Sequence, residues 1–226
     1  MAQAAEDSVW WSRVQAWLGG LGFAGILVTL VFSGLGTRAA ARQVRLSRDA
    51  LIHTDRAFVY PFQTMWNAVK DVNTDKVRSW RMSIRWKNSG NTPTRHLRMW
   101  TNLSVRTDTL VSDFDFPDEG AGDIPTLIAP QATVDTQELE LSLDDLELAI
   151  AGKRHLYAWG WAEYDDVFDR TRRHRTEFCY KINVGGNPRD PNKMTFRWIT
   201  HDRYNGADEE CETPLKATSS KDMGDK

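Results

Sequence analysis

The chain has 226 residues, with 29 Lys and Arg against 31 Asp and Glu, which gives a formal net charge of −2. Hydrophobic residues make up 41% and charged residues 27%, close to the average of globular proteins, which excludes a wholly disordered or fibrous chain. Two cysteines exclude a disulfide-dense secreted scaffold. The near-neutral charge argues against a general nucleic-acid-binding protein, so we do not expect nucleic acid as a partner.

The first predicted element is a transmembrane helix over residues 14–37, preceded by an N-terminal tail of residues 1–13. No charged residue lies between Arg13 and Arg38. A helix over this stretch would be about 36 Å long, enough to cross a hydrocarbon core of about 30 Å. A buried soluble helix, or a signal peptide cleaved near Ala41, is the alternative interpretation.

The charges that flank this stretch predict its orientation. Four arginines follow the apolar stretch before the first acidic residue, Asp49; they are Arg38, Arg42, Arg45 and Arg48. Because positively charged flanks resist translocation, the C-terminal side is expected in the cytoplasm. The sequence thus predicts a single-pass protein with a cytoplasmic C-terminal domain and the lipid bilayer as one partner.

Residues 38–56 are predicted to form a basic helical stalk, because they lack Gly and Pro and are rich in Ala, Leu and Arg. Small residues at Gly25, Thr29 and Ser33 recur every four positions in the apolar stretch and could let two helices pack closely. A homodimer through the membrane helix and the stalk is therefore one hypothesis. The ordinary abundance of glycine in membrane helices and a solvated linker helix are equally acceptable interpretations.

Residues 57–204 are predicted to form a β domain, because apolar and polar residues alternate along several stretches. The clearest alternation runs over 80–86 and again over 97–105. Residues 156–184 read as a long β-hairpin. One face of its first half carries large aromatic residues and the other carries small ones. The aromatic residues are Tyr157, Trp159 and Trp161, and the small ones are Ala158, Gly160 and Ala162. The pattern does not say which face packs inward.

Other local signals complete the expected organisation. Ser142 followed by Asp145 resembles a capping box, which predicts a short helix near 143–151. Residues 194–199 could add an edge strand. Residues 205–226 are polar and are predicted to be a disordered tail.

The predicted fold class is mainly β: an N-terminal transmembrane helix and helical stalk, followed by an antiparallel immunoglobulin-like β-sandwich with one short helix. The Cys…Trp…Cys pattern of true immunoglobulin domains is absent. An open barrel is the alternative architecture.

Three stretches carry a resemblance to a known group: RAFVYP at 56–61, NSGNTPT at 88–94 and GWAEYDDVFDRTRRHRTEFCY at 160–180. With the apolar N-terminal stretch, they resemble uncharacterised bacterial single-span inner-membrane proteins that have a C-terminal β-rich domain. The resemblance implies a location in the bacterial inner membrane and brings no activity with it.

The search for a catalytic site is negative. The chain contains no P-loop, dinucleotide-binding, zinc-protease, nucleophile-elbow or CxxC motif. Its 5 histidines are scattered, and none is spaced from another as metal ligands are. We therefore expect no catalytic residue, no metal ligand and no cofactor.

The densest basic run is the best candidate contact for a partner or an anion. It consists of Arg170, Arg172, Arg173, His174 and Arg175. Phosphate, RNA or lipid headgroups are ligands that such a run could bind. The alternative is a solvated turn whose charge is balanced by Asp165, Asp166 and Asp169.

The leading functional interpretation is a membrane-anchored, non-enzymatic interaction or scaffold module that presents a small β domain to a protein partner. One rival is a hydrolase with a loop-assembled site of Asp165, Asp166 and His174. Another is a sensor of anionic lipid or nucleic acid that uses the arginine-rich hairpin. A deep pocket lined by these groups would favour the hydrolase, whereas an exposed strand edge would favour the module.

Overall fold

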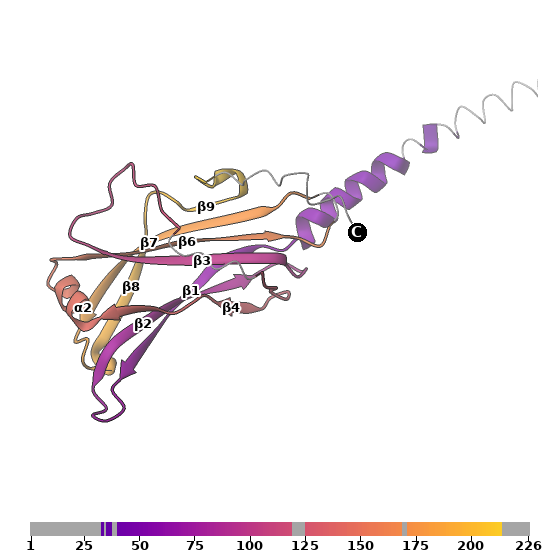
Figure 1. The fold of residues 1–226 in the computed structure, drawn as a ribbon. Coiled ribbons are helices and arrows are strands. Elements are labelled where there is room, and N and C mark those ends of the chain that lie inside the picture. The colour runs from indigo at the N-terminus through magenta and orange to yellow at the C-terminus, as the bar shows by residue number, and fades with distance from the viewer. Residues whose placement is uncertain (1–32, 34, 38–39, 119–124, 169–170, 214–226) are drawn as a thin grey trace, which may run out of the picture. The chain divides into compact units, whose positions relative to one another are not determined.

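The structure is a computed structural model that describes residues 33, 35–37, 40–118, 125–168 and 171–213. The chain divides into two compact units, residues 1–53 and 54–226. Residues 40–55 are helical, and the remaining regular structure is mainly β, in two antiparallel sheets with few helices (Figure 1).

The structure contradicts the prediction of a single-pass membrane protein. Within the described residues, no helix is both long and apolar enough to cross a membrane. The described helix over 40–55 belongs to the predicted stalk and carries Arg42, Arg45 and Arg48, charges that are too costly for a hydrocarbon core. Most of the predicted span 14–37 lies outside the described residues. The transmembrane part of the fold class and the inner-membrane location are therefore corrected.

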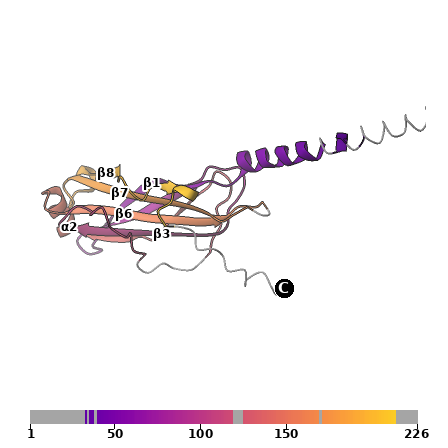
Figure 2. The ribbon, with the colours of Figure 1, turned by 90° about the horizontal axis from the view of Figure 1, so that it is seen from above.

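The two sheets use strands from different parts of the chain. The first sheet contains β1 (Val59–Lys70), β2 (Val77–Asn88), β4 (Thr133–Asp135) and β5 (Leu139–Ser142). The second contains β3 (Arg95–Arg106), β6 (His155–Asp165), β7 (His174–Gly186), β8 (Met194–Thr200) and β9 (Gly206–Ala207). In the first sheet, β2 lies between β1 and the pair β4 and β5, and in the second, β9 also pairs with β7. The other strands of the second sheet have the order β3-β6-β7-β8 (Figure 2).

Two short helices lie between strands, α2 (Leu143–Ile150) and η1 (Pro191–Lys193), and η2 (Asp208–Glu210) follows β9. The predicted capping signal is confirmed for α2, because the Asp145 amide donates a 3.0 Å hydrogen bond to Ser142 Oγ. The predicted hairpin is also confirmed: β6 and β7 pair in one continuous register from Leu156 opposite Ile182 to Tyr164 opposite His174.

A first apolar cluster fills the space between the sheets. The alternating residues Trp80, Met82, Ile84 and Trp86 of β2 all point into it and are at most 5% exposed. The small face of β6 lies opposite, where Gly160 lets the strands pack closely. A β-carbon at this position would clash with the Trp100 carbonyl oxygen and with the Phe178 ring, which itself meets Trp86 edge to face.

The aromatic face of β6 is buried on the other side of the second sheet. Tyr157 and Trp159 belong to a second apolar cluster, together with Cys179, Leu110, Phe116 and Tyr204. The cover consists of chain segments rather than a sheet: Trp159 Nε1 donates a 3.2 Å hydrogen bond to the Pro117 carbonyl oxygen, and Phe116 stacks on Tyr204 at 4.3 Å between ring centroids. The second sheet thus has apolar contacts on both faces.

The C-terminal part of this cover begins at Tyr204 and continues into the stretch 205–226, which is predicted to be disordered. Within that stretch the structure contains β9 and η2 and describes the chain as far as Thr213. Residues 214–226 lie outside the described residues. The segment 204–213 is therefore part of the folded unit.

Candidate functional site

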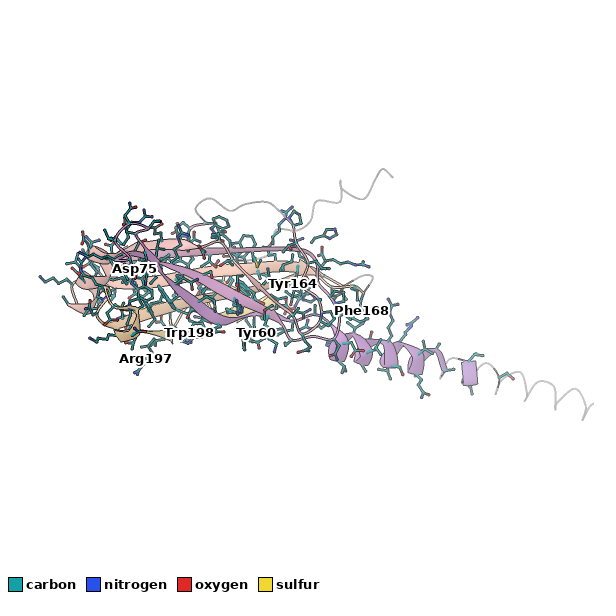
Figure 3. All side chains as sticks on the ribbon, turned by 90° about the horizontal axis from the view of Figure 1, so that it is seen from below. Tyr60, Asp75, Tyr164, Phe168, Arg197 and Trp198 are labelled. Atoms are coloured by element: carbon teal, nitrogen blue, oxygen red, sulfur yellow. The ribbon has the colours of Figure 1, made fainter. Side chains whose placement is uncertain are left out.

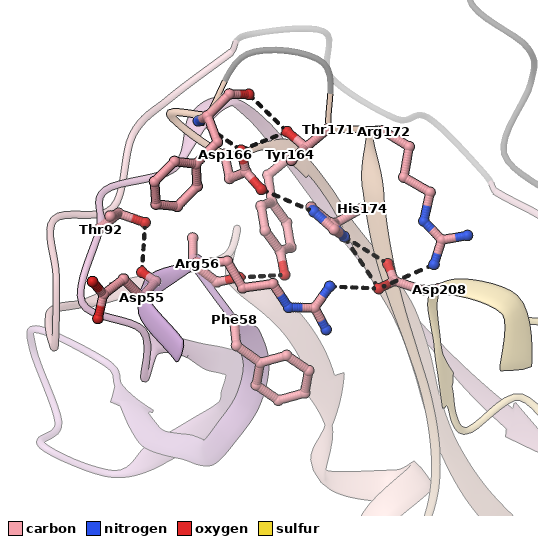
Figure 4. A network of polar contacts seen from close by, with 12 residues as sticks. Asp55, Arg56, Phe58, Thr92, Tyr164, Asp166, Thr171, Arg172, His174 and Asp208 are labelled. Carbon is pink, nitrogen blue, oxygen red and sulfur yellow. Dashed lines mark hydrogen bonds and ion pairs between the residues drawn. The ribbon is translucent and has the colours of Figure 1, made fainter. Parts of the chain in front are cut away.

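A buried histidine lies between two acidic side chains at one end of the second sheet (Figure 4). His174 begins β7, Asp166 follows β6, and Asp208 comes from η2. His174 Nδ1 lies 3.0 Å from Asp208 Oδ1, and His174 Nε2 lies 3.2 Å from Asp166 Oδ2. The pairing of β6 with β7 places Tyr164 opposite His174, with the two rings 5.4 Å apart.

Each ring nitrogen of His174 faces an oxygen of a carboxyl group, so both edges of the imidazole are held by acidic side chains. The His174 side chain is 5% exposed, that of Asp166 0% and that of Asp208 11%. Arg56 Nη1 and Arg172 Nη2 also contact Asp208, at 3.3 and 3.5 Å. Three basic side chains, those of His174, Arg56 and Arg172, thus converge on one carboxyl group.

These contacts set the pKa of Asp208. Burial alone raises the pKa of this carboxyl, but the hydrogen bond and the positive charge of His174 outweigh burial and lower the pKa from 3.8 to about 2. A carboxyl whose pKa is lower in the folded protein stabilises the fold above its unfolded pKa. That stabilisation is lost as the pH falls through the folded value.

We expect the Asp208→Asn variant to be about 2 kcal/mol less stable than the wild type at pH 7, with the difference disappearing between about pH 4 and pH 2. Urea denaturation of both full-length chains across this pH range measures it. Asp135→Asn is the matched control, because Asp135 pairs with Arg85 at 2.7 Å but its side chain is 42% exposed. A gap between Asp208→Asn and the wild type that stays constant down to pH 2 contradicts the expectation.

A second buried ionic cluster lies beside the first, around Arg175 of β7. Arg175 donates hydrogen bonds to Glu177 Oε1 at 2.7 Å, Glu163 Oε1 at 2.5 Å and Tyr204 Oη at 3.1 Å. Its guanidinium also lies over the Trp161 ring, 5.0 Å from the centroid. Burial lowers the pKa of Arg175, but these partners outweigh burial and raise it, so the side chain stays charged.

Glu177 connects this cluster to the C-terminal segment. Its side chain is fully buried and accepts hydrogen bonds from the backbone amides of Glu212, at 2.8 Å, and Thr213, at 3.2 Å. Together with the contacts of Asp208, these bonds attach the segment 204–213 to β7 through charged groups.

The stretch NSGNTPT at 88–94 lies next to the residues that precede β1, at the same end of the domain as His174 (Figure 4). The buried Asn88 Oδ1 accepts hydrogen bonds from the backbone amides of Phe58, at 3.2 Å, and Gly90, at 2.9 Å. Thr92 Oγ1 donates to the Asp55 carbonyl oxygen at 2.9 Å (Figure 4). A β-carbon at Gly90 would clash with the Arg56 carbonyl oxygen. The polar residues of this stretch therefore fix the start of β1.

The predicted basic run is largely neutralised by carboxylates. Arg172 pairs with Asp208 and Glu209, and Arg173 pairs with Glu163 at 3.3 Å and Asp165 at 3.6 Å. His174 and Arg175 are buried in the two clusters, and Arg170 lies outside the described residues. Anion binding by this run stays a prediction.

The small residues proposed for helix contact are mostly not placed. Gly25 and Thr29 lie outside the described residues, whereas Ser33 is helical and exposed. Their role in a homodimer therefore also stays a prediction.

The arrangement around His174 gives no support to the predicted hydrolase alternative, which stays a prediction. A general base must reach a proton of its substrate, and both ring nitrogens of His174 contact carboxyl groups inside the protein. Three surface hollows in the described part of the chain, of about 390, 330 and 280 Å³, are lined by residues other than Asp166, His174 and Asp208. Burial raises the pKa of the Cys179 and Cys211 thiols to about 12, which keeps them protonated at neutral pH.

The described residues also contain no group of three or more His, Cys, Asp or Glu side chains that could hold a metal ion. Sequence reasoning missed Asp208, since it lies 34 positions from His174 and no motif connects the two. No family model, curated protein or solved structure matches this chain.

Proposed function

We propose that this protein is a non-enzymatic interaction module that binds an extended segment of a protein partner along β8. The observation that carries the proposal is the exposed outer edge of this strand. In the second sheet, β8 pairs with β7 on one side and has no partner strand among the described residues on the other. Trp198 and Arg197 mark this edge in Figure 3.

The register shows which backbone groups of β8 are available. The His201 amide donates to the Cys179 carbonyl oxygen at 2.9 Å, and the Asn187 amide donates to the Lys193 carbonyl oxygen at 3.3 Å. Hydrogen-bonded and non-hydrogen-bonded pairs alternate in antiparallel sheets. The backbone amides and carbonyls of the odd-numbered residues of β8 therefore point toward β7. The amides and carbonyls of Phe196, Trp198 and Thr200 therefore point away from the sheet.

The edge of β8 lacks the usual protection against pairing. Natural edge strands are commonly short, or carry proline or several charges. β8 has seven residues, MTFRWIT, without proline and with one charge. Trp198 is 37% exposed and Ile199 is 47% exposed. An added strand would find free backbone groups and apolar side chains together, which is the chemistry of β-strand addition.

β1 is an edge strand of the first sheet, and the backbone groups at its start already have hydrogen-bond partners. The Val59 amide donates to Tyr164 Oη at 3.3 Å, and the Val59 carbonyl oxygen accepts from Thr176 Oγ1 at 2.8 Å. Pro61 has no amide hydrogen to offer. This contrast favours β8 as the binding edge.

The proposal is tested by selecting peptides from a displayed random library on the full-length chain. Amide hydrogen exchange of β8 is then measured with and without a selected peptide. We expect the exchange of the outward Phe196, Trp198 and Thr200 amides to slow when the peptide binds. The amides that already face β7 should be protected in both states.

Two substitutions make this test specific to β8. Trp198→Lys should weaken peptide binding by about tenfold, because a charge on an edge strand opposes pairing. Val72→Lys is the matched control, because Val72 is fully exposed in the β1–β2 turn. Equal weakening by both substitutions, or no change of exchange in β8, would refute the proposal. Protection that depends on protein concentration alone would instead identify a second copy of the chain as the occupant.

A further inference from the structure

A row of basic side chains crosses the outer face of the second sheet at the end opposite the His174 network. Arg106 of β3 lies opposite His155 of β6, and Asn183 of β7 lies opposite Arg197 of β8. Leu156 of β6 lies opposite Ile182 of β7, so continuing this register by one residue aligns His155 with Asn183. Lys181 lies in the adjacent row on the same face, because side chains two positions apart in a strand share a face. We call Arg106, His155, Lys181 and Arg197, together with Arg154, the basic row.

Three adjoining hollows lie along this row. The largest, of about 390 Å³, is lined by Arg154, His155 and Lys181, with parts of α2 and β7. A second, of about 280 Å³, shares Arg154 and adds Arg106, and a third, of about 330 Å³, adds Arg197. The basic side chains therefore line concave surface, where a charged ligand is partly shielded from water.

The charges of the basic row are poorly neutralised, unlike those of the predicted basic run. Across the described residues, no carboxylate pairs with Arg106, Lys181 or Arg197 within ion-pair distance. Arg106 Nε is buried without a hydrogen-bond partner, and its guanidinium lies over the Phe114 ring.

Two acidic residues lie close to the row. Asp145 approaches Arg154 only at 3.7 Å, and Asp108 lines the smallest hollow. The local balance therefore stays positive in a chain whose net charge is −2.

We propose that the basic row binds a small molecule that carries two or more phosphate groups. Neighbouring strands lie about 4.8 Å apart, so the row spans about 14 Å from β3 to β8, too far for a single phosphate to reach every cation. Guanidinium and ammonium groups form charge-assisted hydrogen bonds with phosphate oxygens. A hollow of about 390 Å³ lies within the range of small-molecule sites. The basic row uses side chains on the outer face of the sheet, whereas strand addition would use the backbone edge of β8. Both sites include residues of β8, Arg197 among them.

Isothermal titration of the full-length chain with tripolyphosphate, at constant ionic strength, tests the proposal. We expect saturable binding that is weakened about tenfold by Lys181→Gln and by Arg197→Gln, since each removes a cation from the row. Arg95→Gln is the matched control: Arg95 is exposed at the other end of β3, and its loss should leave binding unchanged. Thermal unfolding of each variant shows whether it folds as the wild type does.

Several results would overturn the proposal. These are heat that does not saturate, binding that follows ionic strength alone, or equal weakening by Arg95→Gln. Inorganic phosphate should bind more weakly than tripolyphosphate, and equal affinity would remove the requirement for several phosphates. A single-stranded oligonucleotide that binds where tripolyphosphate does not would assign the row to nucleic acid instead.

Discussion

Replacing Arg175 with methionine is expected to destabilise the domain by about 3–5 kcal/mol, which is a large part of the stability of an ordinary domain. Arg175 is 4% exposed, and its partner Glu177 has a fully buried side chain. Methionine has a similar length but no charge, so the substitution leaves Glu177 as a buried carboxylate without its cation. Removing one partner of a buried ion pair is costly for this reason.

Chemical denaturation of the full-length chain measures this effect. Arg172→Met is the control, because Arg172 also pairs with carboxylates but its side chain is 48% exposed. Its loss should cost about 1 kcal/mol or less, as is typical of exposed ion pairs. If both variants unfold at the same denaturant concentration as the wild type, the Arg175 cluster does not stabilise the fold.

The second large effect is expected for Trp159→Ala, at about 3–5 kcal/mol. Trp159 is 4% exposed, and its ring meets Phe114 edge to face at 5.2 Å between centroids. Truncation leaves a cavity under the segments that cover the second sheet. It also removes the hydrogen bond from Trp159 Nε1 to the Pro117 carbonyl oxygen.

Trp198→Ala is the matched control, because this tryptophan is 37% exposed on β8. It should cost about 1 kcal/mol, since less apolar surface is returned to water. Denaturation midpoints of the two variants provide the comparison. A Trp159→Ala midpoint equal to that of the wild type would mean that the covering segments do not pack on the sheet in solution.

The strands of the domain were predictable because apolar alternation has the period of a strand, as in Trp80 to Trp86. The same alternation could not say which face of β6 lies between the sheets. Tyr157 and Trp159 are buried by chain segments distant in sequence, so both faces are buried. The contact between His174 and Asp208 could not be predicted either, because the two residues are 34 positions apart and no sequence motif connects them. Apolar length alone predicted a membrane helix, and the structure contradicts that prediction.

The charged contacts of β7 constrain the order in which the domain can be completed during synthesis. His174, Arg175 and Glu177 emerge from the ribosome about 35 residues before Asp208, Glu212 and Thr213, which complete their contacts. Until the later residues are available, β7 carries charges that cannot be buried without a partner. The packing between the sheets can form earlier, because its strands lie closer to the N-terminus. The outer cover of the second sheet should therefore close last, after translation has passed Thr213.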